Sequence, residues 1–167
     1  SAEWDHTVDL TGKRVAAIGN AASDVQFVPP VAEVAGQLTV FQRSANYILP
    51  RNQVVFTDEE LREFQENPDS YRAIRTEIHE VREAGFERTR QGTDLAEEGV
   101  QQAMEHLRSQ VEDPELVEKL TPTYAFGCKR ILRSDNFYPT FNRDNVTLET
   151  SGIRTFTPTG IITEDGV

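Results

Sequence analysis

The sequence predicts an α/β fold with a parallel strand–helix–strand core, an all-helical insertion and a C-terminal β-hairpin. Three observations predict it. Short β-branched runs flank a helical pattern near the start of the chain, the acidic middle third carries only helical signals, and strand patterns return near the end. At 167 residues, the chain has the length of one domain.

The first fifty residues predict two strands joined by a helix. Residues 14–18 and 38–42 are the strand-like runs. Between them, apolar residues recur on one helical face before Gly36, namely Val25, Val28, Val31 or Ala32, and Ala35. Pro29 and Pro30 should limit this helix to a kinked or interrupted course, because proline removes a helical hydrogen bond. The arrangement is that of parallel strands linked by a crossover helix.

The middle of the chain, residues 57–120, reads as consecutive helices. It holds 18 acidic and 8 basic residues, so it carries nearly all of the net charge of −11. Thr57 and Glu60 form a capping-box pattern that opens the first helix. The simplest interpretation of the acidic run is the solvated face of a small helical layer, and the alternative is a protein-binding surface.

The later helices of this region have start and stop signals of their own. Pro68 suits a first helical position, and Gly85 stands where a left-handed C-terminal cap is expected. This second helix carries one apolar face, made by Tyr71, Ile74, Ile78 and Val81. Asp94 with Glu97 opens a third helix, which turns Val100, Ala103, Met104, Leu107 and Val111 inward. A short fourth helix begins at Asp113-Pro114 and runs through Leu120.

The last part of the chain returns to strand patterns. Residues 145–149 alternate as a strand, and residues 153–157 and 160–164 flank a Pro-Thr-Gly turn as a hairpin. We therefore predict one domain over residues 1–167. Its core comprises residues 1–56 and 121–167, and its helical insertion comprises residues 57–120.

Composition excludes several classes of function. A net charge of −11 disfavours nucleic-acid binding, and no apolar run is long enough to span a membrane. A single cysteine allows no internal disulfide, and the three histidines lack metal-ligand spacing, so we expect a cytoplasmic protein without a metal site. The chain begins at Ser1 without a signal-peptide pattern, which we interpret as a piece of a longer protein.

A glycine-containing loop follows the first strand and leads directly into the helix. Its residues are Gly19, Asn20, Ala21, Ala22 and Ser23. In Rossmann-like domains such a loop turns on its first glycine and binds pyrophosphate through free N–H groups at the helix start. Here Ala21 replaces the second glycine, and Asp24 stands at the third small position. An acidic residue there stabilises the helix start but repels phosphate. The loop by itself is equally compatible with an α/β turn that binds nothing.

Two basic sites strengthen the nucleotide interpretation. Arg43 lies at the end of the second strand, where an acidic residue would bind the ribose hydroxyls of NAD, so arginine there favours the 2′-phosphate of NADP. Ser44 can add a hydroxyl group. Lys129 and Arg130 form a second basic pair that could close over the same ligand. The alternative for all three cations is an ordinary solvated surface charge.

Four segments together resemble the flavin-dependent Baeyer–Villiger monooxygenases: Trp4-Asp5, residues 9–19, residues 40–44 and residues 127–130. The resemblance implies a family whose enzymes use NADPH, FAD and O2 to convert ketones to esters or lactones. It also implies that Gly19 and Gln26 line the pyrophosphate and nicotinamide side, and that Arg43, Ser44 and Lys129 hold the 2′-phosphate.

Arg130 is implied as the catalytic arginine, a fixed cation that stabilises the negative charge developing beside the flavin. The FAD-binding domain of the same full-length chain would be missing here, so the isolated chain is expected to bind NADPH but not to turn over a ketone.

Two alternative functions stay open. One is an N- or S-oxygenating flavin monooxygenase, which the Gly127–Arg130 segment disfavours. The other is a non-catalytic protein-binding module with a degenerate nucleotide loop.

Six other residues favour structural interpretations. The histidines His6, His79 and His106 are expected to be surface or helix-side residues. Cys128 has no partner cysteine or neighbouring histidine in the sequence, which favours a buried structural thiol. Phe137 and Tyr138 are adjacent aromatic residues, more typical of a core than of a stacking platform.

Overall fold

A three-stranded parallel sheet forms the centre of the protein. The computed structural model describes residues 3–166, so the ends of the predicted domain, residues 1, 2 and 167, lie outside the described residues. The strands β1 (Arg14–Ile18), β2 (Gln37–Phe41) and β5 (Val146–Glu149) lie in the order β1-β2-β5. Both pairings are parallel, with Thr39 opposite Ala16 on one side and Thr147 on the other.

The crossover helix α1 (Asp24–Val34) joins β1 to β2 and covers one face of this sheet. Pro29 and Pro30 were expected to kink or interrupt this helix, and it is not interrupted: it continues through both prolines to Val34. Both Val28 and Val31 are buried against the sheet. Burial of this apolar face compensates for the hydrogen bonds that the prolines remove.

The main core lies between α1, the sheet and the segments that follow the helical insertion. A short 3₁₀ helix, η2 (Tyr138–Asn142), packs against β5 and α1, and the helix α4 (Asp94–Gln110) packs against η2. Phe137 and Tyr138 are each only 2% exposed, which confirms their prediction as core residues. The largest fully buried side chains of the main core include Phe137, Leu38, Leu107, Leu120, Val28 and Val40.

The predicted helices of the middle region are present. They are α2 (Asp58–Glu66), α3 (Pro68–Ala84), α4 and α5 (Pro114–Lys119). The capping box of α2 is confirmed, since Glu60 N donates to the Thr57 hydroxyl and Thr57 N donates to the Glu60 carboxylate. The prediction of a left-handed cap at Gly85 is wrong. Gly85 has φ −69°, and the chain tightens there into the 3₁₀ helix η1 (Gly85–Thr89).

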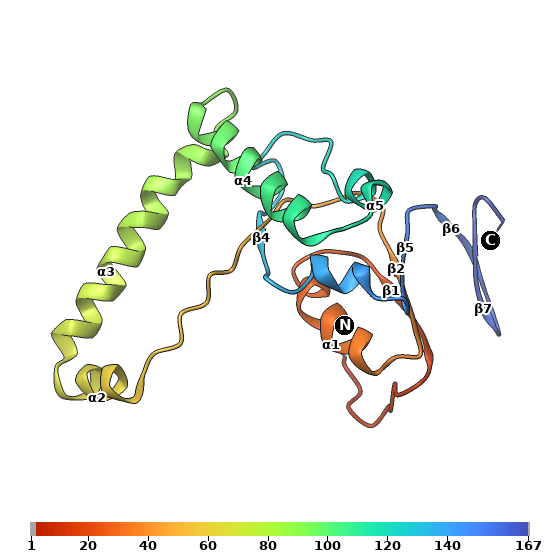
Figure 1. Ribbon diagram of the computed structural model, residues 1–167, viewed down its shortest axis with the longest axis horizontal. Coiled ribbons are helices and arrows are strands. Elements are labelled where there is room, and N and C mark those ends of the chain that lie inside the picture. Colours follow the sequence, from red (N-terminus) through yellow and green to blue (C-terminus); the bar gives the residue numbers. More distant parts are fainter. Residues whose placement is uncertain (1–2, 167) are drawn as a thin grey trace.

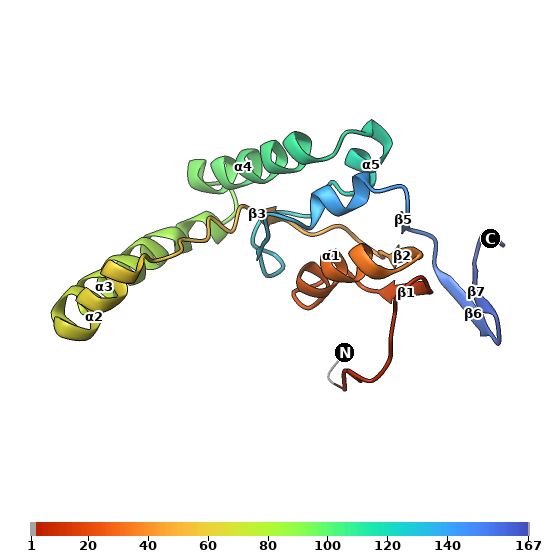
Figure 2. The ribbon, with the colours of Figure 1, turned by 60° about the horizontal axis from the view of Figure 1, so that its bottom comes forward.

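The helices α2 and α3 form an arm that projects away from the sheet (Figures 1 and 2). Neither helix contains a buried residue. Phe56, Phe64 and Tyr71 nevertheless stack edge to face along the inner side of the arm, with centroid separations of 5.1 and 6.3 Å. The predicted apolar face of α3 instead stays largely exposed, since Tyr71, Ile78 and Val81 are 56%, 47% and 67% exposed, while α4 packs on the core.

Two pairs of strands complete the fold. The short strands β3 (Ile48–Leu49) and β4 (Leu132–Arg133), which the sequence did not predict, pair in parallel on either side of the helical insertion. The strands β6 (Ile153–Thr157) and β7 (Gly160–Thr163) pair antiparallel at the opposite end of the molecule from the arm (Figure 1). None of the helices in the described part of the chain is long and apolar enough to cross a membrane.

Two residues differ from their sequence-based interpretation. Cys128 is exposed, not buried, because its loop lies at the surface, where Gln91 Nε2 lies 3.2 Å from its sulfur. His106, expected at a helix surface, is only 8% exposed. Its Nε2 lies 2.8 Å from the carbonyl oxygen of Ser134, and its ring packs against Tyr138.

Candidate functional site

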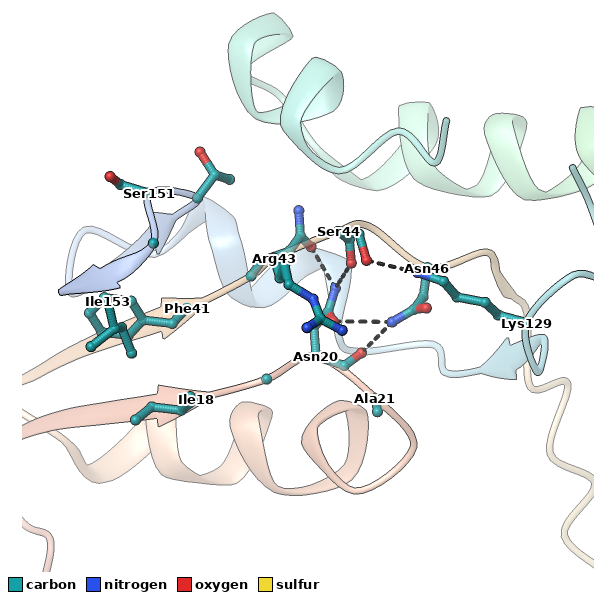
Figure 3. Close-up of a pocket in the computed structure, with 14 residues that line it drawn as sticks. Ile18, Asn20, Ala21, Phe41, Arg43, Ser44, Asn46, Lys129, Ser151 and Ile153 are labelled. Carbon is teal, nitrogen blue, oxygen red and sulfur yellow. Dashed lines mark hydrogen bonds between the residues drawn. The ribbon is translucent and has the colours of Figure 1, made fainter. Parts of the chain in front are cut away.

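A pocket opens where the three parallel strands end. Its volume is about 610 Å³, within the range of about 300–1,000 Å³ typical of ligand sites. The pocket is formed by the carboxyl end of each strand and by one residue of the loop after the helical insertion (Figure 3). Its lining residues are Ile18, Gly19, Asn20, Ala21, Phe41, Gln42, Arg43, Ser44, Asn46, Lys129, Thr150, Ser151, Gly152 and Ile153. In open parallel sheets, ligands bind at this edge.

Gly19 shapes the first wall of the pocket. Its φ of +126° lies in a region that side-chain-bearing residues rarely adopt, so glycine is required for the chain to leave β1 here. The Gly19 N–H donates to the carbonyl oxygen of Phe41, which ties the loop to the end of β2. The following residues, Asn20 and Ala21, then pass over the pocket before α1 begins.

The start of α1 leaves several N–H groups available. Ser23, the N-cap residue, makes no side-chain capping bond. Among the described residues, the N–H groups of Asn20, Ala22 and Ser23 have no hydrogen-bond acceptor. Unpaired N–H groups at a helix start carry partial positive charge and attract an anion. The Ala21 N–H is different, because it donates to Asp24 Oδ2 at 3.0 Å.

A network of side-chain amides holds the loop against the end of β2 (Figure 3). Asn20 Nδ2 donates to Gln42 Oε1 at 2.7 Å and to the Ser44 carbonyl oxygen at 2.9 Å. Asn46 Nδ2 donates a hydrogen bond to the Asn20 carbonyl oxygen at 2.9 Å. Gln42 Nε2 donates in turn to the carbonyl oxygen of Lys119. The network therefore links the loop to the end of the helical insertion.

Lys129 reaches the pocket from a loop far away in sequence. Its Nζ donates to Ser44 Oγ at 2.8 Å and lies 4.3 Å from the centroid of the Tyr124 ring. Burial raises the pKa of Tyr124 above its usual range, so the ring beneath the ammonium stays neutral. The neighbouring Arg43 is exposed at the same pocket and forms no ion pair among the described residues.

The structure brings together six of the ten predicted site residues. Gly19, Asn20, Ala21, Arg43, Ser44 and Lys129 all line the pocket. Ala22, Ser23 and Gln26 belong to the next turn and do not line it, and the Gln26 side chain donates to the Ala22 carbonyl oxygen. Arg130 is exposed outside the pocket lining. No cluster of three or more metal-ligating side chains occurs among the residues described.

Sequence reasoning missed several lining residues. Thr150–Ile153 follow β5, and they join the pocket because β5 lies beside β2. The sequence predicted this strand but not its place in the sheet. Asn46 was also missed, although a polar residue just after Arg43 and Ser44 was an available signal.

Fold and site together define an α/β protein whose parallel strands end at a pocket that two cationic side chains, Arg43 and Lys129, help to line. No family model matches the chain. It is, however, similar over 99% of its length to a Baeyer–Villiger monooxygenase of Pseudomonas aeruginosa, at 39% identity. The chain covers 32% of that protein and spans about a third of the length of the curated relatives it matches.

Solved structures give the same result. The fold matches an oxidized steroid monooxygenase bound to NADP with a TM-score of 0.79 and 33% identity, over 97% of this chain and 38% of that one. It matches a complex of the enzyme OTEMO with FAD and NADP with a TM-score of 0.76 and 30% identity, over 95% and 36% of the two chains. The resemblance to Baeyer–Villiger monooxygenases seen in the sequence is therefore confirmed over the whole chain.

Proposed function

We propose that this chain is the Rossmann-like NADP(H)-binding domain of an FAD-dependent monooxygenase of the Baeyer–Villiger type. Residues 1–56 and 121–167 would form the binding core, residues 57–120 the helical insertion, and β6 with β7 the C-terminal hairpin. The observation that carries the proposal is the convergence of Gly19, Arg43, Ser44 and Lys129 on one pocket, in a chain similar throughout to these enzymes.

The donors that line the pocket, and those of the adjoining start of α1, fit the parts of NADP. The unpaired N–H groups of Asn20, Ala22 and Ser23 suit a pyrophosphate. The cations of Lys129 and Arg43, with the hydroxyl of Ser44, suit the 2′-phosphate that distinguishes NADP from NAD. Gln26, exposed one turn into α1, would lie on the nicotinamide side.

The reaction would require groups outside this chain. NADPH would supply the hydride that reduces FAD, and the reduced flavin with O2 would supply the oxygen atom inserted beside the carbonyl group of a ketone, with the second oxygen atom leaving as water. We propose that FAD is held by another domain of the same longer polypeptide. Arg130 is exposed and free of any hydrogen bond or ion pair to the other described residues. It would be the catalytic arginine, a cation directed toward the flavin and substrate. We expect the protein to be cytoplasmic.

Calorimetric titration of the chain with NADP⁺ and NAD⁺ tests the proposal. We expect NADP⁺ to bind more tightly than NAD⁺, and Arg43→Ala to weaken NADP⁺ binding about tenfold while leaving NAD⁺ unchanged, because an arginine–phosphate pair is lost. The isolated chain should not oxidise NADPH in the presence of a ketone. Failure of both nucleotides to bind would contradict the proposal and favour a protein-binding module.

A further inference from the structure

Asp24 places a negative charge directly beside the loop of residues 19–23, which would bind the pyrophosphate of NADP. It is the first residue of α1 and is only 9% exposed. Its Oδ2 accepts the hydrogen bond of the Ala21 N–H at 3.0 Å. A Cβ atom built on Gly19 would lie 3.2 Å from the same oxygen, so the carboxylate rests directly against the glycine that ends β1. Ala21 and Gly19 both line the pocket.

No cation compensates this carboxylate within the described residues. The two ion pairs found there, Arg72–Asp69 and Arg90–Glu87, belong to the helical insertion. The one hydrogen bond found for the Asp24 side chain in the described part of the chain comes from the Ala21 N–H. Asp24 is therefore stabilised by the same source that attracts a pyrophosphate, namely the N–H groups and the positive end of the dipole at the start of α1.

We propose that Asp24 is an internal anion that limits the affinity of this loop for the pyrophosphate of a dinucleotide. The inference rests on the proposed NADP-binding function and deepens it. A pyrophosphate over residues 19–23 meets a fixed like charge one hydrogen bond away, and finds one N–H group of the loop already engaged. At separations of a few ångströms, like charges repel by enough to change a dissociation constant about tenfold or more.

The proposal separates two effects of one side chain. In the free protein the carboxylate stabilises the start of α1, because it accepts an otherwise unpaired N–H and complements the helix dipole. In the complex with a dinucleotide, the same negative charge repels the pyrophosphate. Removing its charge must therefore lower stability and raise affinity at the same time. A residue with a purely structural role would lower both.

Asp24→Asn tests this, because it removes the charge and keeps an acceptor for the Ala21 N–H. The ligands are NADP⁺ and 2′-AMP, which carries the 2′-phosphate but no pyrophosphate. We expect Asp24→Asn to bind NADP⁺ about tenfold more tightly than the unchanged chain, with 2′-AMP affinity unaltered and Tm about 2 °C lower. Asp24→Ala should also tighten NADP⁺ binding, and it covers the case in which the asparagine variant folds poorly.

The matched control is Asp58→Asn. Asp58 is likewise the first residue of a helix, α2, but it is exposed on the distant arm. This variant changes the net charge equally and should leave both affinities unchanged. Unaltered or weaker NADP⁺ binding by both Asp24 variants, or an equal gain for 2′-AMP, would overturn the inference. If neither ligand binds any of these proteins, the proposed function itself fails, which distinguishes the two failures.

Discussion

Replacing Lys129 with alanine should weaken binding of NADP⁺ and leave binding of NAD⁺ nearly unchanged. Lys129 Nζ donates to Ser44 Oγ at 2.8 Å, so a 2′-phosphate oxygen that contacts this hydroxyl would lie about 4–5 Å from the ammonium. Two unit charges at about 4 Å interact by about 1 kcal/mol in water and about 4 kcal/mol near a protein surface. Because Lys129 is exposed, we expect about 1.4–2.8 kcal/mol, or about 10- to 100-fold in Kd.

The assay is calorimetric titration of both nucleotides at two salt concentrations. The NADP⁺ affinity of the unchanged chain should fall as salt rises, since an exposed charge pair is screened. Arg143→Ala is the matched control, because Arg143 is an exposed cation that precedes β5, at the end of the sheet away from the pocket. Equal loss of NADP⁺ and NAD⁺ affinity in Lys129→Ala, or no loss of either, would refute the placement of the 2′-phosphate at Lys129.

Three further predictions concern stability. Phe137→Ala should destabilise the fold by about 3–5 kcal/mol in urea denaturation, because it empties a fully buried site. Gly36→Ala should destabilise the fold by at least about 1–3 kcal/mol, because the new Cβ would lie 2.4 Å from the Gly12 carbonyl oxygen. Gly85→Ala should instead stabilise the fold by about 0.4–1 kcal/mol, because Gly85 has φ −69° and open space around the new Cβ. Burial raises the pKa of Tyr138 well above its usual value, so stability should be full below about pH 10 and fall as the pH rises further, with Tyr138→Phe flattening that loss.

Each of these outcomes can fail in a definite way. A loss below about 1 kcal/mol for Phe137→Ala would contradict its place at the centre of the core. Destabilisation by Gly85→Ala would instead support the left-handed conformation at Gly85 that the sequence suggested. For Tyr138, the phenol keeps its proton in the folded state while the unfolded chain loses it above about pH 10, so an alkaline profile identical in the phenylalanine variant would contradict the buried environment.

Much of the fold was accessible from local signals. The capping box at Thr57 and Glu60, the proline at position 68 and the valines of α1 each act within one or two turns of chain, so their patterns predicted the helices closely. The cap at Gly85 was a local failure, whereas the missed strands depended on distant contacts. The two-residue strands β3 and β4 exist only because segments more than eighty residues apart meet, and a pair of residues carries no periodicity.

The candidate site divides in the same way. The loop at Gly19 and the basic residue Arg43 follow strands that the sequence itself marks, so they could be assigned to one sheet edge. Lys129 was assigned to the 2′-phosphate only through the resemblance, since its place in the sequence made it no more than a cation that could close over the same ligand. Its bond to Ser44 depends on the path of the chain through the whole helical insertion. Thr150–Ile153 were not anticipated, because their membership depends on strand order. Asn46 follows β2 and was missed although a local signal was available.

By itself, the sequence determined the α/β class, the crossover unit with its glycine loop, the acidic helices and the resemblance to Baeyer–Villiger monooxygenases. Periodicity, caps and motifs are short-range properties, and they survive without knowledge of contacts. Only the tertiary structure decided that β5 lies beside β2, that His106 is buried while Cys128 is exposed, and that the Asp24 carboxylate occupies an N–H group of the loop. Each of these depends on which surfaces exclude water and which groups meet, and packing between distant segments sets both.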